Sequence, residues 1–438
     1  GFFVVAMVLH GELARDRPPA RHLTEFYLWV AVGGVLGGVF NALIAPVVFP
    51  GVVEYPLAIV LACLFLPGTV LSRLLSPSGD REEPQRTTRR FIDPRWLDLA
   101  LPLILGVVLV ALGWIVGPIV DPYLSNTDLL QLLIGLAAGV CLYFAYGSNR
   151  PIRFGLSIGA LVVAGTILLG LGEGVIYENR DFFGVRKVTG DEQYHALSHG
   201  DTNHGAEFLG ATPPEPITYY HRTGPVGQLF DALPNQDAKS RVALLGLGTG
   251  SMACYNSPGQ RWTFYEIDPL VENIARDPSL FTYLRDCPGD SEVVLGDARL
   301  KIAEAPDGEY GMIVGDAFSS DAIPVHLITR EAIDLYLQKL KSDGVLALHI
   351  SNRHLALEPV LGDLAQDRRL TCYAQFDGQT EGIPGKFGSN WVVMARRDAD
   401  LGSVPTDGRW QPCATSPDPE EDVWTDDFSN LLSTFVWD

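Results

Sequence analysis

The sequence lacks the residue groupings that bind zinc. Its six cysteines form no Cys-x-x-Cys pair, and none stands at zinc-ligand spacing from a histidine. The nearest approach to a metal set is His199 and His204, five residues apart with Asp201 between them. A ligand-covering loop, with these histidines as hydrogen-bond donors, and a polar surface hairpin are the other interpretations of this segment. We expect no metal here.

Positive charge is scarce in the second part of the chain. Residues 173–438 contain 21 Lys and Arg against 41 Asp and Glu, whereas residues 1–172 contain 11 of each sign, the basic ones all Arg. The formal net charge of −20 therefore belongs to the second part. An acidic surface repels phosphate groups, which argues against nucleic acid and anionic lipid as its direct partners.

Long apolar runs are confined to the first part. A helix needs about 20 apolar residues to cross a bilayer, and runs close to this length cover residues 26–49, 97–120, 129–146 and 154–171. A shorter, proline-containing run covers 55–71, and residues 1–9 resemble the tail of another helix. We expect 1–172 to be an α-helical transmembrane domain of five to six spans, with the lipid bilayer as its partner.

The start of the chain suggests missing upstream sequence. It opens on Gly inside an apolar run and has no initiator Met. A signal peptide is the competing interpretation, but it would need a basic n-region and a small-residue cleavage site, and both are absent. We expect further sequence, and further spans, before residue 1.

Arginines predict the orientation of the spans. They cluster at residues 15–21, at 73–95 and at 150 with 153, whereas the alternate connections, 50–55 and 118–128, have none. Arginine-bearing loops face the cytoplasm by the positive-inside tendency. Three spans follow residues 73–95, so the acidic part would emerge outside the cytoplasm, across a bacterial-type inner membrane. That side conflicts with an intracellular cofactor.

Cysteine positions bear on the same question. The acidic part has an even number of them: Cys254, Cys287, Cys372 and Cys413. Cys254 would open the helix after a glycine turn and Cys287 precedes a strand, two places that can approach each other in a doubly wound sheet. A disulfide would indicate an oxidising compartment. Buried free thiols in a cytoplasmic domain are the alternative.

Strands and helices alternate regularly after residue 240. Strands are predicted at 242–247, 262–267, 292–295, 310–314 and 344–350, and helices from 251 and at 269–275, 299–305 and 330–340. This β-α-β repetition predicts an α/β Rossmann-like domain with a mostly parallel sheet over 241–397. Residues 173–240 form a strand-and-loop subdomain, with strand-like pieces at 182–188 and 216–220. Residues 398–438 form an acidic, proline-containing tail, with its acids in a solvated linker and an apolar end, 428–437, that docks either on the domain or on a partner.

Three motifs fall at the carboxyl ends of the predicted strands, where such sheets bind ligands. The turn GLGTG has Gly246, Gly248 and Gly250, the second strand ends at Glu266, and GDA after the third strand has Asp297 and Ala298. Glycines allow close approach of backbone to ligand, and Glu266 is placed to accept hydrogen bonds from both ribose hydroxyls. A third spaced glycine for a pyrophosphate is missing, which favours a single adenosyl group over a dinucleotide.

A fourth motif, GDAFSSDAIP at 315–324, follows the fourth strand and contains Asp316 and Asp321. Carboxylates at this edge of the sheet can hold an amine substrate and accept its proton. Solvated turn formation is the competing interpretation.

The order of these motifs resembles the spermidine synthase family, more closely its membrane-fused relatives, the fused major-facilitator and spermidine synthase proteins. The resemblance covers most of 181–352, and residues 21–38 are similar to the membrane part of these fusions. Such enzymes transfer an aminopropyl group from decarboxylated S-adenosylmethionine to putrescine without a metal. The resemblance implies that Glu266 binds ribose, Asp297 the adenine side, Tyr220 and His221 the polyamine, and Asp316 or Asp321 the amine.

The sequence also departs from this family's pattern. Thr249 stands where the family's GGGDGG has its Asp, Ser319 where its DSSDP loop has a catalytic Asp, and Arg222 where its YHE has the acid. Three functions are therefore compatible with the sequence: aminopropyl transfer to a polyamine, methyl transfer from S-adenosylmethionine, and a non-catalytic module that binds polyamine or joins a homo-oligomer or larger membrane assembly.

Overall fold

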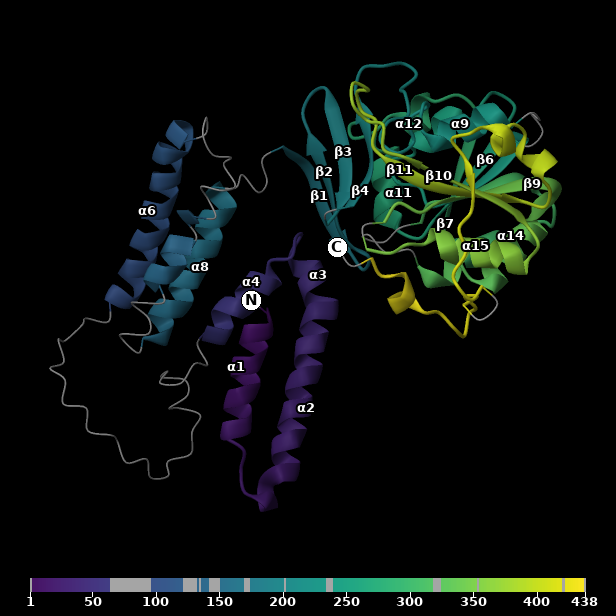
Figure 1. Cartoon of the computed structure of the whole chain (residues 1–438). Helices are drawn as coiled ribbons and strands as arrows, with labels where there is room; N and C mark the ends of the chain where they lie inside the picture. Colours follow the sequence, from purple (N-terminus) through teal and green to yellow (C-terminus); the bar gives the residue numbers. More distant parts are fainter. Residues whose placement is uncertain are drawn as a thin grey trace. The chain divides into compact units, whose positions relative to one another are not determined.

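The chain divides into two compact units, Gly1–Glu173 and Gly174–Asp438, and the domain boundary predicted at 172/173 lies beside this division. Figure 1 shows the first unit from purple to blue and the second from teal to yellow. The computed structural model describes residues 2–63, 96–120, 132–133, 135–141, 150–168, 174–200, 202–233, 239–317, 324–352, 354–419 and 422–436.

The first unit is helical. Two of its segments are long and apolar enough to cross a membrane by length and composition: Ala20–Val48, with a mean hydropathy of 1.9, and Leu97–Ile115, with 2.3. Only 6% and 11% of these windows are buried, unlike a soluble core helix, although a signal sequence passes the same test. Much of the run predicted at 129–146 lies outside the described residues. The helices are α1 (Phe2–Arg15), η1 (Ala20–His22), α2 (Leu23–Val39), η2 (Phe40–Ile44), α3 (Ala45–Val48), α4 (Glu54–Ala62), α6 (Leu97–Val120) and α8 (Pro151–Leu168).

Helices α6 and α8 pack in parallel. A Cβ on Gly106 would lie 3.4 Å from the Cβ of Ala160, so a small residue allows the two helices to approach closely. At their N-terminal ends, Asp98 accepts hydrogen bonds from Arg150 at 3.0 Å and from Nε of Arg153 at 3.1 Å. Both arginines thus share one carboxylate.

The second unit contains an eight-stranded sheet in the order β12-β10-β11-β9-β8-β5-β6-β7. Strands β7, β6, β5, β8 and β9 are parallel neighbours, whereas β11 is antiparallel to both β9 and β10. The doubly wound, mostly parallel Rossmann-like sheet is therefore confirmed. The strands are β5 (Arg241–Leu245), β6 (Arg261–Glu266), β7 (Asp290–Leu295), β8 (Tyr310–Gly315), β9 (Leu340–His349), β10 (Thr371–Asp377), β11 (Ser389–Ala395) and β12 (Gln411–Pro412).

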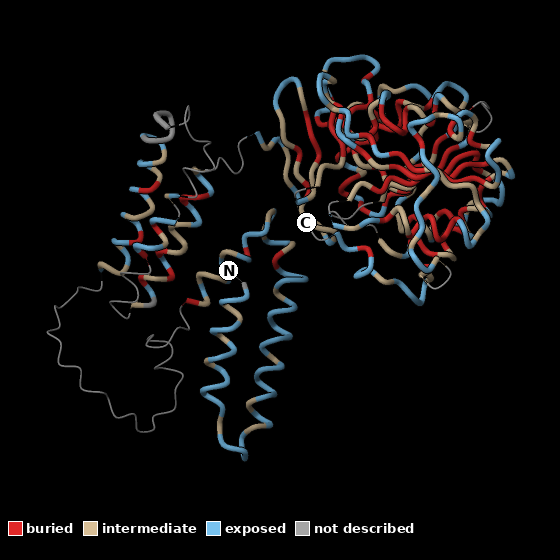
Figure 2. Tube along the Cα trace, viewed as in Figure 1, coloured by how far each residue is buried: buried red, intermediate tan, exposed pale blue. Residues whose placement is uncertain are grey.

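Helices cover both faces of this sheet. In β5, Ala243 and Leu245 face one buried cluster and Val242 and Leu244 face the other, as strand alternation requires. Both sets are buried, so central strands appear in sequence as unbroken apolar runs, and Figure 2 shows them in red. The helices are α9 (Pro225–Ala232), η4 (Ser251–Tyr255), α11 (Pro269–Arg276), α12 (Tyr283–Asp286), α13 (Ala298–Ala303), η5 (Val325–Leu327), α14 (Arg330–Lys339) and α15 (Glu358–Asp367).

An antiparallel sheet precedes the Rossmann-like sheet. It consists of β1 (Val175–Asp181), β2 (Gly184–Gly190), β3 (Tyr194–His199) and β4 (Thr202–Phe208). The polar segment that contains His199 and His204 is thus a strand hairpin, not an irregular loop. The strand expected at 216–220 is not formed, because Thr218 has a positive φ of 61° and makes only an isolated bridge to Lys386.

The C-terminal segment packs on the α/β core, contrary to the solvated linker expected at 398–438. Val423 and Trp424 are buried among core side chains, and β12 pairs with β10. Short helices η6 (Asp398–Leu401), η7 (Val404–Thr406) and η8 (Leu431–Thr434) connect these contacts. The free energy gained by burying these apolar side chains outweighs the tendency of the acidic residues to keep the segment in solvent.

Two disulfides cross-link the second unit. Cys254 bonds to Cys287, 33 residues away, with their Cα atoms 4.8 Å apart. Cys372 in β10 bonds to Cys413, with Cα atoms 5.5 Å apart. All four cysteines of the acidic part are therefore paired in the structure, while Cys63 and Cys141 of the first unit are free thiols.

Candidate functional site

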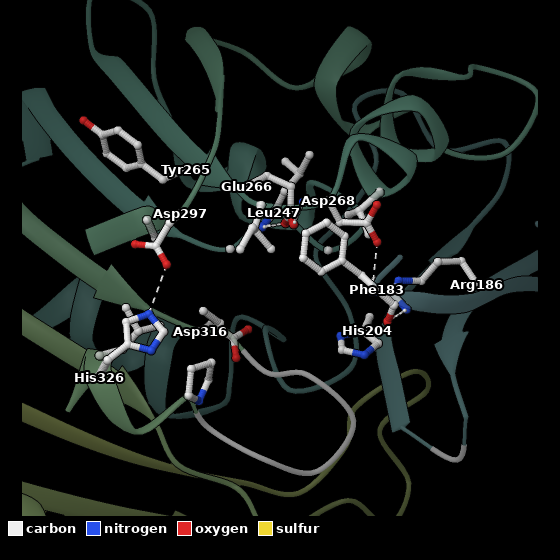
Figure 3. A pocket seen from close by; sticks show the side chains of 18 of the residues that line it. Phe183, Arg186, His204, Leu247, Tyr265, Glu266, Asp268, Asp297, Asp316 and His326 are labelled. Atoms are coloured by element: carbon white, nitrogen blue, oxygen red, sulfur yellow. Dashed lines mark hydrogen bonds and ion pairs between the residues drawn. The ribbon is translucent and has the colours of Figure 1, made fainter. Parts of the chain in front are cut away.

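A cavity opens at the carboxyl ends of β5, β6 and β8. Side chains from the antiparallel sheet, Phe183, Arg186 and His204, line its other side. Figure 3 shows Glu266 and Leu247 at the upper centre of the view, Asp268 with Arg186 on the right, Asp297 above His326 on the left, and Asp316 between His326 and His204. The cavity thus collects most of the motifs that the sequence placed at strand ends.

The glycine turn requires glycine for a steric reason. Gly246 and Gly248 line the cavity with positive φ values of 105° and 55°. A Cβ on Gly246 would lie 2.3 Å from the carbonyl oxygen of Asp316, and one on Gly248 would lie 2.6 Å from that of His204. Gly250 does not line the cavity and packs toward Leu284. The turn therefore fits tightly between β8 and β4.

Glu266 ends β6 inside the cavity and is 7% exposed. Its Oε2 accepts a hydrogen bond from the Leu247 N–H at 2.9 Å, and its Oε1 accepts one from the Asp268 N–H at 2.8 Å. Burial raises the pKa of Glu266, partly offset by these N–H donors. Two donors leave lone pairs on both oxygens for further donors such as ribose hydroxyls.

Asp297 and Ala298 lie after β7 and line the cavity. Asp297 is also the N-cap of α13, because its Oδ1 accepts a hydrogen bond from the Leu300 N–H at 2.9 Å. Its Oδ2 lies 3.1 Å from Nε2 of His326. This carboxylate thus combines a structural role with a position on the cavity rim.

Asp316 follows β8 and carries a carboxylate with two side-chain partners. Tyr220 donates its hydroxyl to Oδ2, and Nδ1 of His349 lies 2.7 Å from Oδ1. Tyr220 and Asp316 line the cavity. Asp321, the other carboxylate of this motif, and Ser319 lie outside the described residues.

The predicted substrate histidines occupy different places. His204 lines the cavity, whereas His199 and His221 do not. The His199 and His204 rings stack with centroids 6.0 Å apart, and burial lowers the pKa of His199. In the part of the chain that the structure describes, no three His, Cys, Asp or Glu side chains are grouped as metal ligands. His221 instead contacts the Thr223 hydroxyl at 3.0 Å.

An ion pair that the sequence did not predict lines the cavity beside Glu266. Arg186 of β2 contacts the Asp268 carboxylate at 2.9 Å, and both side chains are buried. Burial raises the pKa of Asp268 to about 7, with a further contribution from Asp181 and opposition from Arg186. Asp268 stands at the carboxyl end of a strand, so the expectation that ligand-binding side chains lie at strand ends could have found it. Arg186 comes from an antiparallel sheet whose register the sequence does not reveal.

Two of the departures from the spermidine synthase pattern lie away from the cavity. Thr249 is fully buried against Gly205 of β4 and does not line the cavity. Arg222 pairs with Glu215 at 2.7 Å and donates to the carbonyl of Cys254 at 3.0 Å. Neither position supplies a carboxylate to a bound ligand.

Comparison with curated proteins finds two kinds of transferase. The chain is 35% identical over 132 residues to the polyamine aminopropyltransferase of Vibrio vulnificus, covering 29% of this chain and 41% of that protein. It is 34% identical over 122 residues to the N-terminal histidine N-methyltransferase of Emericella nidulans, covering 27% and 21%. The chain thus spans less than half the length of either relative. No protein-family model matches it.

Similar solved structures include spermidine synthases. A probable spermidine synthase from Corynebacterium glutamicum has a TM-score of 0.40 at 19% identity and covers 51% of this chain and 79% of its own. The spermidine synthase from Thermotoga maritima has a TM-score of 0.36 at 16% identity and covers 60% and 84%. At these scores the fold assignment depends on the sheet order and on the matches to curated sequences. On those grounds, the second unit is a spermidine synthase-like or methyltransferase-like α/β domain.

Proposed function

We propose that the second unit is an adenosyl-dependent aminopropyltransferase that acts on putrescine or a related amine. The observation that carries this proposal is a single cavity lined both by Glu266 and Asp297, which can hold an adenosyl group, and by Asp316 and Tyr220, which can hold an amine. Its similarity to the polyamine aminopropyltransferase adds support. Decarboxylated S-adenosylmethionine would be the co-substrate, and the reaction needs no metal.

The residues divide the reaction between them. Glu266 accepts hydrogen bonds from the ribose hydroxyls, Asp297 and Ala298 bind the adenine side, and Tyr220 and Asp316 receive the amine, with Asp321 of the same sequence motif. The amine binds as an ammonium, and loss of one of its protons to Asp316 frees the lone pair that attacks the methylene carbon next to the sulfonium. The carbon–sulfur bond breaks, its electron pair goes to sulfur, and methylthioadenosine leaves. The proton of the amine goes to the Asp316 carboxylate and then to solvent.

Methyl transfer from S-adenosylmethionine is the second candidate. Thr249 has no carboxylate and is buried outside the cavity, so it cannot hold the aminopropyl amine as the Asp of spermidine synthases does. This favours methyl transfer. Arg186 lines the cavity, and its guanidinium, which contacts Asp268, has further N–H donors for the carboxylate of intact S-adenosylmethionine. The match to the histidine N-methyltransferase also supports this candidate.

We further propose that the first unit anchors the protein in an inner membrane and that the α/β unit lies outside the cytoplasm. The support is the two disulfides, since such bonds persist in oxidising compartments. An intracellular adenosyl donor conflicts with that location, so the location favours a non-catalytic module that binds polyamine or joins a membrane assembly over both transferases. Thiol alkylation in intact cells, with and without prior reduction, tests this: modification of Cys254 and Cys413 without a reductant would contradict an oxidising location.

The decisive experiment presents both labelled adenosyl donors to the purified full chain in detergent, with putrescine as acceptor. Release of methylthioadenosine from decarboxylated S-adenosylmethionine supports aminopropyl transfer. Release of S-adenosylhomocysteine from S-adenosylmethionine supports methyl transfer instead. Absence of binding of either nucleoside by calorimetry excludes both activities and favours the non-catalytic module.

A further inference from the structure

The Asp316 carboxylate stands beside an imidazole because of the register of two parallel strands. Gly315 at the end of β8 pairs with Leu348 of β9, so the next residues, Asp316 and His349, emerge side by side. Their side chains are 10% and 6% exposed, and Nδ1 of His349 lies 2.7 Å from Oδ1 of Asp316. The contact is thus short, buried and set by the sheet.

The hydrogen bonds continue from His349 to the backbone of β11. Nε2 of His349 lies 2.7 Å from the Ser351 hydroxyl, and that hydroxyl oxygen accepts the Asn390 N–H at 2.8 Å. Ser351 can therefore direct its own proton to Nε2, which assigns the proton of a neutral imidazole to Nδ1. Nδ1–H then donates to Asp316. Each of these three hydrogen bonds is therefore donated in the direction of the Asp316 carboxylate.

Aromatic rings hold the imidazole in this orientation. The Tyr219 ring stacks on His349 with centroids 4.5 Å apart and planes 14° apart, and the Trp391 ring lies 4.9 Å away on a 30° tilt. His349 is 5% exposed and lies between these rings. Because the ring cannot swing away without losing these contacts, Nδ1–H stays on Asp316.

The same three residues, Asp316, His349 and Ser351, have the order of a serine hydrolase triad, and the surroundings argue against that role. The Ser351 oxygen already accepts the Asn390 N–H. Ser351 is also absent from the side chains that line the cavity, whereas Asp316 is among them. The group that meets a ligand is therefore the carboxylate, and Ser351 fixes the tautomer of the imidazole.

We propose that His349 is a positioning residue that, with Tyr220, holds the Asp316 carboxylate directed into the cavity, so that the site selects a cationic amine as acceptor. A carboxylate has about four lone-pair sites. Tyr220 and His349 occupy one site on each oxygen and leave the others for the N–H groups of the amine. This inference rests on the proposed function, because it assumes that the acceptor binds at Asp316.

The test compares His349→Phe, which keeps the aromatic packing and removes the donor, with His349→Gln, which restores an N–H donor. His354→Phe is the matched control, since His354 is exposed and stacks on Phe435 away from the cavity. In the full chain in detergent, we expect His349→Phe to raise the KM for putrescine at least tenfold and to move the acid limb of the pH profile to higher pH. His349→Gln should recover most of both, and methylthioadenosine affinity should change less than twofold in all three.

Unchanged KM and pH profile in His349→Phe would overturn the positioning role. Turnover in Ser351→Ala as low as in Asp316→Asn would overturn it too, because it would make the serine a reacting group. If the wild type neither binds putrescine nor turns over, the proposed function fails. The hydrogen-bond chain is then judged by ¹⁵N-histidine NMR: an Nδ1–H signal that disappears in His349→Phe and shifts in Asp316→Asn supports it, and its absence from the wild type refutes it.

Discussion

The two ends of the cavity hold their carboxylates in different ways. Glu266 accepts its hydrogen bonds from backbone N–H groups of Leu247 and Asp268. Asp316 depends on side chains of Tyr220 and His349, which are 96 and 33 residues away in the sequence. Backbone N–H donors are present at these positions whichever side chains the two residues carry, whereas side-chain donors require particular residues. The Glu266 end, where we propose that the adenosyl group binds, is thus held by the fold, and the Asp316 end, where we propose that the amine binds, is held by particular side chains of this sequence.

Asp316→Asn should separate the two ends most clearly. An amide can neither take the amine proton nor balance the charge of an ammonium, so we expect turnover to fall about 10²- to 10⁴-fold. Methylthioadenosine affinity should stay within a factor of two, because the adenosyl end is untouched. Methylthioadenosine release and calorimetry measure the two quantities. The exposed Asp334→Asn serves as control, and equal loss at both ends would mean that the cavity is not divided as described.

Removal of the Cys254–Cys287 disulfide tests how far the adenosyl end depends on the fold. The bond closes a loop of 33 residues behind the glycine turn, which corresponds to about 3 to 4 kcal/mol of unfolding free energy. The double variant Cys254→Ser, Cys287→Ser should therefore melt at lower temperature and bind methylthioadenosine more weakly. The matched variant Cys372→Ser, Cys413→Ser should lose similar stability with unchanged affinity. Equal methylthioadenosine affinity in the two double variants would show that the glycine turn does not depend on the Cys254–Cys287 disulfide.

Glu266→Gln addresses the carboxylate of the adenosyl end. A hydrogen bond to a buried charged group contributes about 1.5 to 3 kcal/mol, so we expect methylthioadenosine affinity to fall roughly 10- to 100-fold. Putrescine affinity should change little. The control is Glu304→Gln, whose parent side chain is 67% exposed. If Glu266→Gln binds methylthioadenosine as tightly as the wild type, then Glu266 only holds the glycine turn and does not bind the nucleoside.

The weakest effect concerns the pH dependence of stability. Burial lowers the pKa of His199 below its usual 6.5, so the folded state resists its protonation. Its contribution to stability is complete above pH 6.5 and declines as the pH falls toward the folded pKa. Tryptophan-monitored melting at pH 7.5 and 5 should therefore show a smaller loss in His199→Gln than in the wild type. Identical losses would contradict a neutral, buried imidazole.

Sequence patterns predicted the central sheet well because its strands are buried on both faces and carry unbroken apolar runs. They placed Glu266 and Asp316 at the edge of the sheet because the first ends such a strand and the second directly follows one. His349 is the last residue of β9 and was within reach of the same rule. The helix expected from Ser251 is only the short 3-10 turn η4, because Pro258 follows soon after it. Arg186 and the burial of Thr249 depend on how the antiparallel sheet packs, which no local pattern reveals.

The C-terminal segment also contacts the rim of the cavity. Asp426 forms two hydrogen bonds of 2.7 Å with Arg299, which directly follows Ala298, and the same guanidinium donates to the carbonyl of His326 at 2.9 Å. Asp426 is synthesised 127 residues after Arg299. On the ribosome, this rim of the cavity therefore cannot reach its final form until nearly the whole α/β unit has been made, so a complete cavity marks a finished domain.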